Sequence, residues 1–261
     1  MNVALCFSGK LGDWDKSRES IRENLIKPLR PDIFLSTWES EHYETFNNVV
    51  GVKKYKVMKN SEGDLFPNEE DLPCKPKNAL IPMLVNMKSV YDLVLSHEKN
   101  NKIKYDVIIR VRPDLIINEQ IKKHEIVNSI RNKKIRLPFF ESLNIYDHEK
   151  EMKKEFSFGF INDQASLPNQ VNDQIALGEH SGMKKYMNSI SFVKNAINLL
   201  WNEGYPEYMI KVPESVLTIC LQLSNCKYQK LTGSNPFGNI STRIAKKNGM
   251  DKRKTRSTIL D

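Results

Sequence analysis

The sequence lacks long apolar runs and has few cysteines. No stretch approaches the roughly 18 uninterrupted apolar residues that a membrane-spanning helix needs, so we expect no transmembrane segment. The four cysteines, Cys6, Cys74, Cys220 and Cys226, show neither Cys-x-x-Cys nor Cys/His ligand spacing. This pattern is typical of reduced thiols in a reducing compartment, not of a disulfide framework or a zinc site.

Common catalytic motifs are also missing. The five histidines show no metal-ligand spacing, and no Gly-x-Ser-x-Gly is present, which argues against ordinary zinc and serine hydrolase chemistry. Gly9-Lys10 is not part of a Walker loop, and there is no Gly-x-Gly-x-x-Gly. The first residues lack the basic and then apolar pattern of a secretory signal, so we expect a cytoplasmic protein.

The composition indicates a folded chain with a basic end. A length of 261 residues, 39% of them hydrophobic, is enough for one sizeable α/β domain. Residues 237–261 hold seven Lys and Arg against two Asp and so carry most of the net charge of +8. We expect a domain over residues 1–236 and a basic tail over 237–261, suited to peripheral contact with an anionic surface.

Hydrophobic patterning predicts alternating strands and helices. Apolar runs at 3–7 and 32–38 flank an amphipathic helix at 15–29, and this βαβ order requires parallel strands. Residues 39–80 are predicted to be an irregular insertion with weak strand character at 55–58. Further helices are expected at 83–99, 125–133, 183–204 and from Pro213. The side chains of the last helix that are expected to point inward are Val216, Leu217, Cys220 and Leu223. Further strands are expected at 105–117, 135–140, 156–160, 174–177 and 228–231. The fold class is therefore α/β, a single Rossmann-like domain with a mostly parallel central sheet flanked by helices.

The most informative stretch is Arg110-Val-Arg-Pro-Asp114, where an apolar strand ends in three charges. If the strand continues through Pro113, Arg110, Arg112 and Asp114 share one face at its carboxyl end, where open α/β sheets bind ligands. Two guanidinium groups there can hold a diphosphate, and Asp114 can bind a divalent cation or a sugar hydroxyl. The structural alternative is an Arg/Asp ion-pair ladder.

Two further loops are predicted to lie at the same edge. Ser8-Gly9-Lys10 follows the first strand and precedes the first helix, a position where backbone N–H groups often meet a phosphate, although an ordinary turn fits equally well. Ser36-Thr37-Trp38 ends the second strand, where Thr37 offers a hydroxyl and Trp38 an aromatic wall or a core side chain.

Two carboxylates are candidates for acid–base chemistry. Asp173 precedes the strand at 174–177 and suits either a base or an Asx turn. Glu214 lies in the first turn of a helix, where the helix dipole stabilises a carboxylate whatever its role.

Several of these segments together are similar to a known pattern. They are Leu-Cys-Phe-Ser-Gly-Lys-Leu, Asp-Ile-Phe-Leu-Ser-Thr-Trp, Tyr-Asp-Val-Ile-Ile-Arg-Val-Arg-Pro-Asp-Leu, Asn-Asp-Gln-Ile-Ala-Leu-Gly and Pro-Glu-Ser-Val-Leu. In this order, over roughly residues 2–231, the chain resembles the GT-A-like glycosyltransferases of bacterial polysaccharide clusters and large DNA viruses.

The resemblance implies a UDP-, GDP- or dTDP-linked sugar donor and a glycan or glycoconjugate acceptor. Ser8, Gly9 and Lys10 would face the nucleotide, and Asp114 would stand where the metal-binding Asp-x-Asp of the family ends. Arg112 replaces the first Asp of that motif, which puts dependence on Mn²⁺ or Mg²⁺ in doubt and leaves the arginines to neutralise the diphosphate. If configuration inverts, Asp173 is the first choice for the base and Glu214 the second.

Other functions remain open from the sequence. A nucleotide-dependent sulfo- or phosphotransferase would use the same entrance but needs a phosphate loop that this chain lacks. The basic tail suggests a non-catalytic polyanion-binding protein, and a catalytically dead scaffold is a further alternative.

Overall fold

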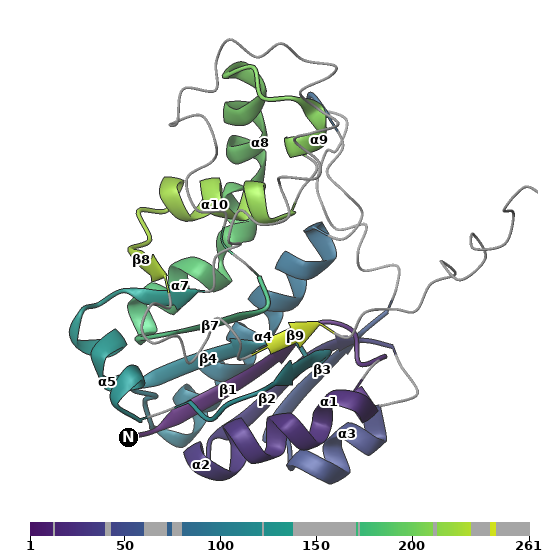
Figure 1. Cartoon of the computed structure of the whole chain (residues 1–261), viewed down its shortest axis with the longest axis vertical. Helices are drawn as coiled ribbons and strands as arrows, with labels where there is room; N and C mark the ends of the chain where they lie inside the picture. Colours follow the sequence, from purple (N-terminus) through teal and green to yellow (C-terminus); the bar gives the residue numbers. More distant parts are fainter. Residues whose placement is uncertain are drawn as a thin grey trace, which may run out of the picture.

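A seven-stranded mixed sheet forms the centre of the molecule (Figure 1). The structure, a computed structural model, describes residues 1–12, 14–39, 43–59, 72–74, 80–121, 123–137, 171, 173–210, 213–230 and 241–243. The strands lie side by side in the order β3-β2-β1-β4-β7-β6-β8. In chain order they are β1 (Val3–Ser8), β2 (Asp32–Trp38), β3 (Lys54–Met58), β4 (Val107–Val111), β6 (Ile135–Leu137), β7 (Ile175–Gly178) and β8 (Tyr228–Lys230). All strand pairs are parallel except those of β7, which confirms the predicted α/β class with a mostly parallel sheet.

The chain reverses its direction of growth across the sheet at β1. From β1 it proceeds outward to β2 and β3, and it then returns to the other side of β1 to form β4. Ser8 pairs with Ser36 on one side of β1, and Phe7 pairs with Val111 on the other. Growth of the sheet therefore changes direction between β1 and β4, which makes the carboxyl ends of these two strands a topological switch point.

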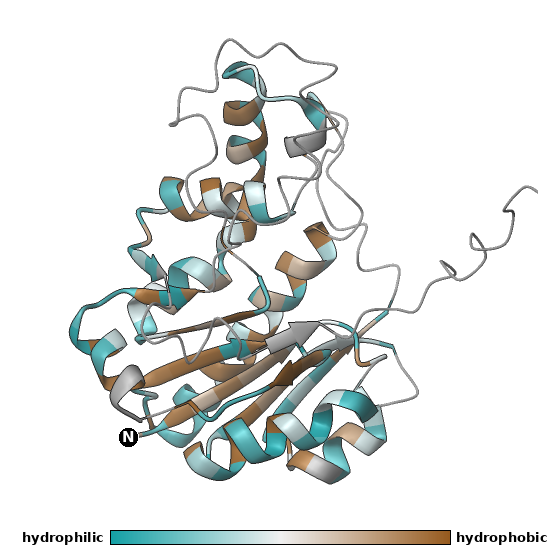
Figure 2. Ribbon diagram, viewed as in Figure 1, coloured by the Kyte–Doolittle hydropathy of each residue, from teal (hydrophilic) through white to brown (hydrophobic). Residues whose placement is uncertain are grey.

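Helices cover both faces of the sheet. One face carries α1 (Trp14–Ile21), η1 (Arg22–Ile26), α2 (Lys27–Leu29), α3 (Tyr43–Val50) and α5 (Lys123–Arg131). The other carries α4 (Leu80–Asn101), α7 (His180–Met187), η5 (Ser189–Phe192), α8 (Val193–Asn202), α9 (Glu207–Ile210) and α10 (Pro213–Leu223). The central strands β1 and β4 are largely brown with apolar residues, while the helices that cover the sheet carry much teal (Figure 2), as expected for strands buried on both faces.

The predicted irregular insertion is wrong for residues 43–50, whereas the strand character predicted at 55–58 is confirmed. Helix α3 and strand β3 lie there, and Phe46 of α3 packs on Trp14 and Phe7 with ring centroids 4.3 and 5.0 Å apart. Phe46 and Val50 are buried apolar positions of this short helix. Two positions are too few to produce a recognisable helical period in the sequence.

Two other predicted elements are divided in the structure. The strand expected at 105–117 ends at Val111, and after a turn at Pro113 the chain forms β5 (Leu115–Ile117), which pairs with β9 (Ser241–Arg243) in a separate sheet. Residues of the predicted basic tail thus contact the body of the protein. The helix expected from residue 183 is two helices, α7 and α8, joined by the 3-10 turn η5.

Other helix and strand predictions have simpler outcomes. Those at 3–7, 15–29, 32–38, 83–99, 125–133, 174–177 and 228–231 are confirmed within a few residues. Leu223 of α10, predicted to point inward, is 40% exposed because it belongs to the last turn of the helix. The strand predicted at 156–160 lies outside the described residues.

Glu179 caps the amino end of α7. Its carboxylate accepts hydrogen bonds from the backbone N–H groups of Ser181 and Gly182, at 2.8 and 2.7 Å, and from the Ser181 hydroxyl. Burial alone raises the pKa of Glu179, but these bonds and the nearby His180 bring it below its usual value. The carboxylate form therefore stabilises the helix.

We expect Glu179→Gln to lower the free energy of unfolding by about 1 kcal/mol at pH 7. Since the pKa of Glu179 is lower in the folded state, its contribution is present above the unfolded value of about 4.3 and disappears as the pH falls through the folded value. Urea unfolding of both proteins should show the difference closing below about pH 4. A difference that stays constant with pH, or an equal one for the exposed Glu119→Gln, would contradict this role.

Candidate functional site

The carboxyl ends of β1 and β4 bring Ser8 and Arg110 together. Ser8 is the last residue of β1 and is buried. The Nε atom of Arg110 donates to the Ser8 hydroxyl at 2.7 Å, and its Nη2 atom lies 3.4 Å from the Ser8 carbonyl oxygen. The first loop and the strand ending in charge, both predicted to contribute to the site, are thus in direct contact at the switch point.

Arg110 is a buried cation that forms no ion pair with any residue that the structure describes. Its exposed fraction is 1%, and its third contact, from Nη1 to the Tyr186 hydroxyl, is 3.5 Å long. No carboxylate of the described residues forms an ion pair with it. Burial raises the pKa of the Cys6 thiol although Arg110 lowers it, so the nearby thiol stays neutral and does not balance the charge. An unbalanced buried charge is costly, and it favours binding of an anion from outside the chain.

Tyr186 is a residue of this site that sequence reasoning missed. It lies on α7 and is fully buried, with its hydroxyl accepting from Arg110. Burial raises the pKa of Tyr186, the charge of Arg110 lowers it, and the charge of Asp173 raises it, with a net increase. The phenol therefore remains neutral. The available signal in the sequence was a hydroxyl-bearing residue within the apolar positions of a helix.

Gly9 continues from Ser8 with a backbone conformation that favours glycine. Its φ is +131°, and its N–H donates to the Ser36 carbonyl at 3.2 Å. A Cβ atom here would lie 3.6 Å from Pro113, an ordinary contact, so backbone strain and not space opposes another side chain. Lys10, the next residue, is exposed at this edge.

Arg112, Asp114 and Asp173 form a second charged group. Arg112 Nε and Nη2 donate to Asp114 Oδ1 and Oδ2 at 2.9 and 2.8 Å, a bidentate pair, and Nη1 donates to Asp173 Oδ2 at 3.2 Å. The Arg112 amide also donates to the Gln174 carbonyl at 3.0 Å. Part of the expected ion-pair ladder is therefore present, although Arg110 is not part of it.

The expectation that Arg110, Arg112 and Asp114 share one strand face depended on an extended Pro113. The strand ends at Val111, and Pro113 and Asp114 form a turn, so this condition is not met. The turn is held by Ser17 of α1, whose hydroxyl donates to the Pro113 carbonyl. As a result, Arg110 points to Ser8 and Tyr186, whereas Arg112 is engaged by the two aspartates.

Asp173 is positioned by this contact. Its exposed fraction is 4%, and Arg112 binds its Oδ2 atom. Within the described part of the chain, Oδ1 has no hydrogen-bond partner. Arg112 thus fixes one oxygen of Asp173 in position.

The residues at the end of β2 divide between the two faces of the sheet. The Ser36 hydroxyl donates to Asn86 Oδ1 of α4 at 3.0 Å, on the face that also carries Arg110. Thr37 alternates to the opposite face, where its hydroxyl bonds the Trp38 carbonyl at 3.2 Å. Trp38 is 6% exposed, as in a core side chain. Asn86, a buried amide, is a second residue that sequence reasoning missed.

Glu214 is the second residue of α10. Its carbonyl accepts from the Thr218 hydroxyl at 2.7 Å, and the same hydroxyl accepts from the Val171 amide at 3.1 Å. The first turn of α10 is therefore linked to the chain two residues before Asp173.

Asp114 does not fit the predicted metal ligand. Both of its oxygens are bound by Arg112, as the distances above show. No group of three or more His, Cys, Asp or Glu side chains that could hold a metal ion occurs among the described residues.

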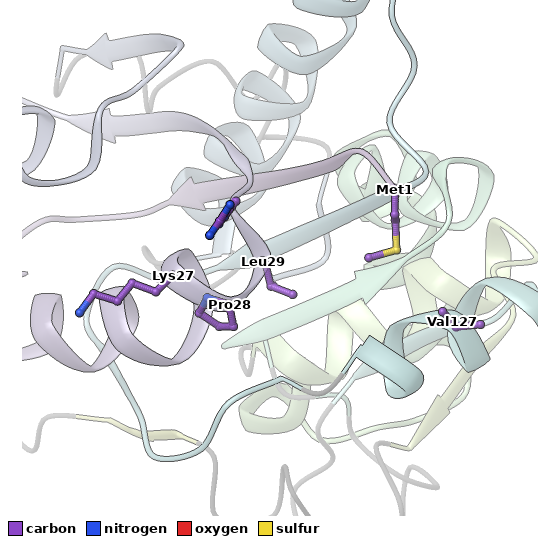
Figure 3. A pocket seen from close by; sticks show the side chains of 6 residues that line it. Met1, Lys27, Pro28, Leu29 and Val127 are labelled. Carbon is purple, nitrogen blue, oxygen red and sulfur yellow. The ribbon is translucent and has the colours of Figure 1, made fainter.

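A hollow lies at the other end of β1 (Figure 3). It has a volume of about 500 Å³ and is lined by Met1, Lys27, Pro28, Leu29, Arg30 and Val127. Because Met1 precedes β1, this hollow is at the amino end of the parallel strands and is separate from the switch point. None of the residues predicted to bind the donor lines it.

No family model matches this chain, and no curated protein matches it. Within the ranges that the structure describes, no helix is both long and apolar enough to cross a membrane.

Proposed function

We propose that the protein is a glycosyltransferase that moves a sugar from a nucleotide-sugar donor to a hydroxyl of a glycan or glycoconjugate. The proposal combines the sequence resemblance with the position of the predicted residues at the switch point of an α/β sheet, where ligands of such sheets bind. The observation that carries it is the buried Arg110, which has no carboxylate partner among the described residues.

The proposed role of Arg110 is to bind the diphosphate of the donor. As glycosyl transfer proceeds, negative charge develops on the departing nucleoside diphosphate, and a preorganised cation stabilises that charge. Arg110 is held by Ser8 and Tyr186, so little reorganisation accompanies the reaction. The Ser8-Gly9-Lys10 loop is proposed to contact the nucleotide, with the exposed Lys10 as a second cation.

Asp173 is the proposed general base of an inverting reaction. A base must accept the proton of the acceptor hydroxyl from a fixed position. The hydrogen bond from Arg112 fixes Oδ2 of Asp173, and Oδ1 is proposed to accept the proton of the acceptor hydroxyl. The acceptor oxygen then forms a bond to the anomeric carbon of the sugar as the nucleoside diphosphate departs. Glu214, linked to the same region through Thr218, is the second choice.

A thermal-shift screen tests the proposal. UDP, GDP, dTDP and CMP, with their common sugar conjugates, are added to the full chain with Mn²⁺ and with EDTA, and ATP serves as the comparison. One nucleotide diphosphate should raise Tm selectively by a few degrees at millimolar concentration, because a ligand of the folded state stabilises it. Mass spectrometry then follows sugar transfer. If no nucleotide diphosphate raises Tm, the proposal is wrong; a shift with ATP alone would favour a phosphotransferase.

A further inference from the structure

Two buried hydroxyl groups accept hydrogen bonds from the guanidinium group of Arg110. The Ser8 hydroxyl accepts from Nε at 2.7 Å, and the Tyr186 hydroxyl accepts from Nη1 at 3.5 Å. The exposed fraction is 1% for Ser8 and for Arg110, and 0% for Tyr186. Because a guanidinium group donates hydrogen bonds and cannot accept them, the proton of each hydroxyl needs another partner.

Neither hydroxyl proton has an acceptor within the part of the chain that the structure describes. Ser8 Oγ and Tyr186 Oη take part in the hydrogen bonds from Arg110 and in no other among these residues. Burial raises the pKa of Tyr186, with a net increase despite the charge of Arg110, so the phenol keeps its proton. Arg110 itself has more N–H groups than its three contacts with Ser8 and Tyr186 use.

The same few atoms therefore combine a positive charge with hydrogen-bond donors that lack acceptors. A buried donor without an acceptor costs free energy, and so does a buried charge without a counter-charge. One anionic group with several acceptor oxygens would meet both demands, and a phosphoryl group has this chemistry. Ser8 is followed directly by Gly9 and the exposed Lys10, so the donors adjoin a loop that reaches the surface.

We infer that Ser8, Arg110 and Tyr186 form a phosphoryl-binding site in which both hydroxyl groups donate to oxygen atoms of the bound group. Ser8 and Tyr186 then contact the ligand directly, in addition to holding Arg110. The identity of the natural ligand rests on the proposed function, which makes it the diphosphate of the nucleotide-sugar donor.

The test uses inorganic pyrophosphate, which offers phosphoryl oxygens without a base or a sugar. Added to the full natural chain in EDTA, it should raise Tm, because it binds the folded state. Tyr186→Phe and Ser8→Ala each remove one hydrogen bond to a charged group. Each should weaken the pyrophosphate affinity measured by calorimetry by at least about tenfold.

Two matched variants remove buried hydroxyl groups elsewhere. Tyr91→Phe changes a buried tyrosine whose hydroxyl lies 3.4 Å from His180 Nδ1, and Ser129→Ala changes a buried serine that donates to the Ile126 carbonyl at 2.9 Å. Both should bind pyrophosphate within about twofold of the natural affinity, because neither hydroxyl contacts Arg110. An equal loss in either control, or natural affinity in both Tyr186→Phe and Ser8→Ala, would overturn the inference.

A crystal structure of the natural protein with pyrophosphate separates direct binding from positioning and needs no variant to fold. We expect Ser8 Oγ and Tyr186 Oη within hydrogen-bond distance of phosphoryl oxygens. Pyrophosphate bound to Arg110 alone, or away from all three side chains, would overturn the inference.

Nucleotide diphosphates distinguish this inference from the proposed function. If pyrophosphate binding depends on both hydroxyl groups but no nucleotide diphosphate raises Tm, the inference is supported and the proposed function is contradicted. If a nucleotide diphosphate binds Tyr186→Phe and Ser8→Ala as tightly as the natural protein, the inference is overturned and the proposed transferase stands.

Discussion

Replacing Arg110 by methionine is expected to weaken binding of the nucleotide diphosphate by at least about 100-fold without unfolding the protein. Charge-assisted hydrogen bonds contribute about 1.5–3 kcal/mol each, and a guanidinium group can supply two of them to a diphosphate. Arg110 reaches this position from the buried end of β4, and no described carboxylate competes for it. The affinity measured by calorimetry with the nucleotide from the screen checks this expectation.

The effect of Arg110→Met on stability separates binding from a structural role. Because the natural side chain is a buried charge with no ion-pair partner in the described part of the chain, an apolar side chain of similar length should leave Tm within a few degrees or raise it. If Arg110 serves mainly to hold Ser8 and Tyr186, the variant would instead lose stability and keep its nucleotide affinity. That outcome would contradict the anion site.

Two controls accompany this variant. Arg18→Met removes an exposed arginine of α1, paired with Asp15 at 3.5 Å, and should change neither affinity nor Tm appreciably. Arg110→Lys keeps the charge but loses the planar fork, so its affinity should lie between those of the natural protein and Arg110→Met.

The position of Ser8 and Arg110 at one edge of the sheet was predictable, whereas their contact depends on β4 lying next to β1. An apolar run, a helix and a second apolar run require parallel strands, whose carboxyl ends lie at one edge. The later apolar strand, β4, carries Arg110 next to its last residue, and its place beside β1 brings its end to the end of β1. Knowing that both strands belong to one parallel sheet is enough to place Ser8 and Arg110 at one edge.

The pairing of Arg112 with Asp173 was not predictable in the same way. It depends on β7 running antiparallel beside β4, and the four-residue apolar run at 175–178 carries no signal of direction. It also depends on the turn at Pro113, since a continuous strand would have placed Arg112 differently. Proline restricts its neighbour but does not determine whether a strand ends or bends.

Tyr186 and Asn86 show a third limit. Both lie on helices whose burial is evident from apolar spacing, but a hydroxyl or amide on a buried face points to a specific partner only after the helices are docked on the sheet. Their partners, Arg110 and Ser36, are 76 and 50 residues away in the chain. A single sequence therefore indicates that such groups need partners without identifying them.

Asp173→Asn is expected to reduce turnover by about 10²–10⁴-fold while nucleotide affinity stays within a few-fold of the natural value. The amide has nearly the shape of the carboxylate and can still accept from Arg112, but it does not accept the proton of the acceptor hydroxyl. Steady-state kinetics with the donor and acceptor found by the screen, together with the affinity of the nucleotide alone, separates these two effects.

Glu214→Gln is the matched comparison for this test. It removes the second candidate carboxylate, and if Asp173 is the base, its turnover should remain near normal. Asp173→Asn with near-normal turnover would refute the assignment, and a large loss in Glu214→Gln alone would transfer the role of base to α10. If both variants keep near-normal turnover while folded, neither carboxylate is the base, and a retaining reaction becomes the better account.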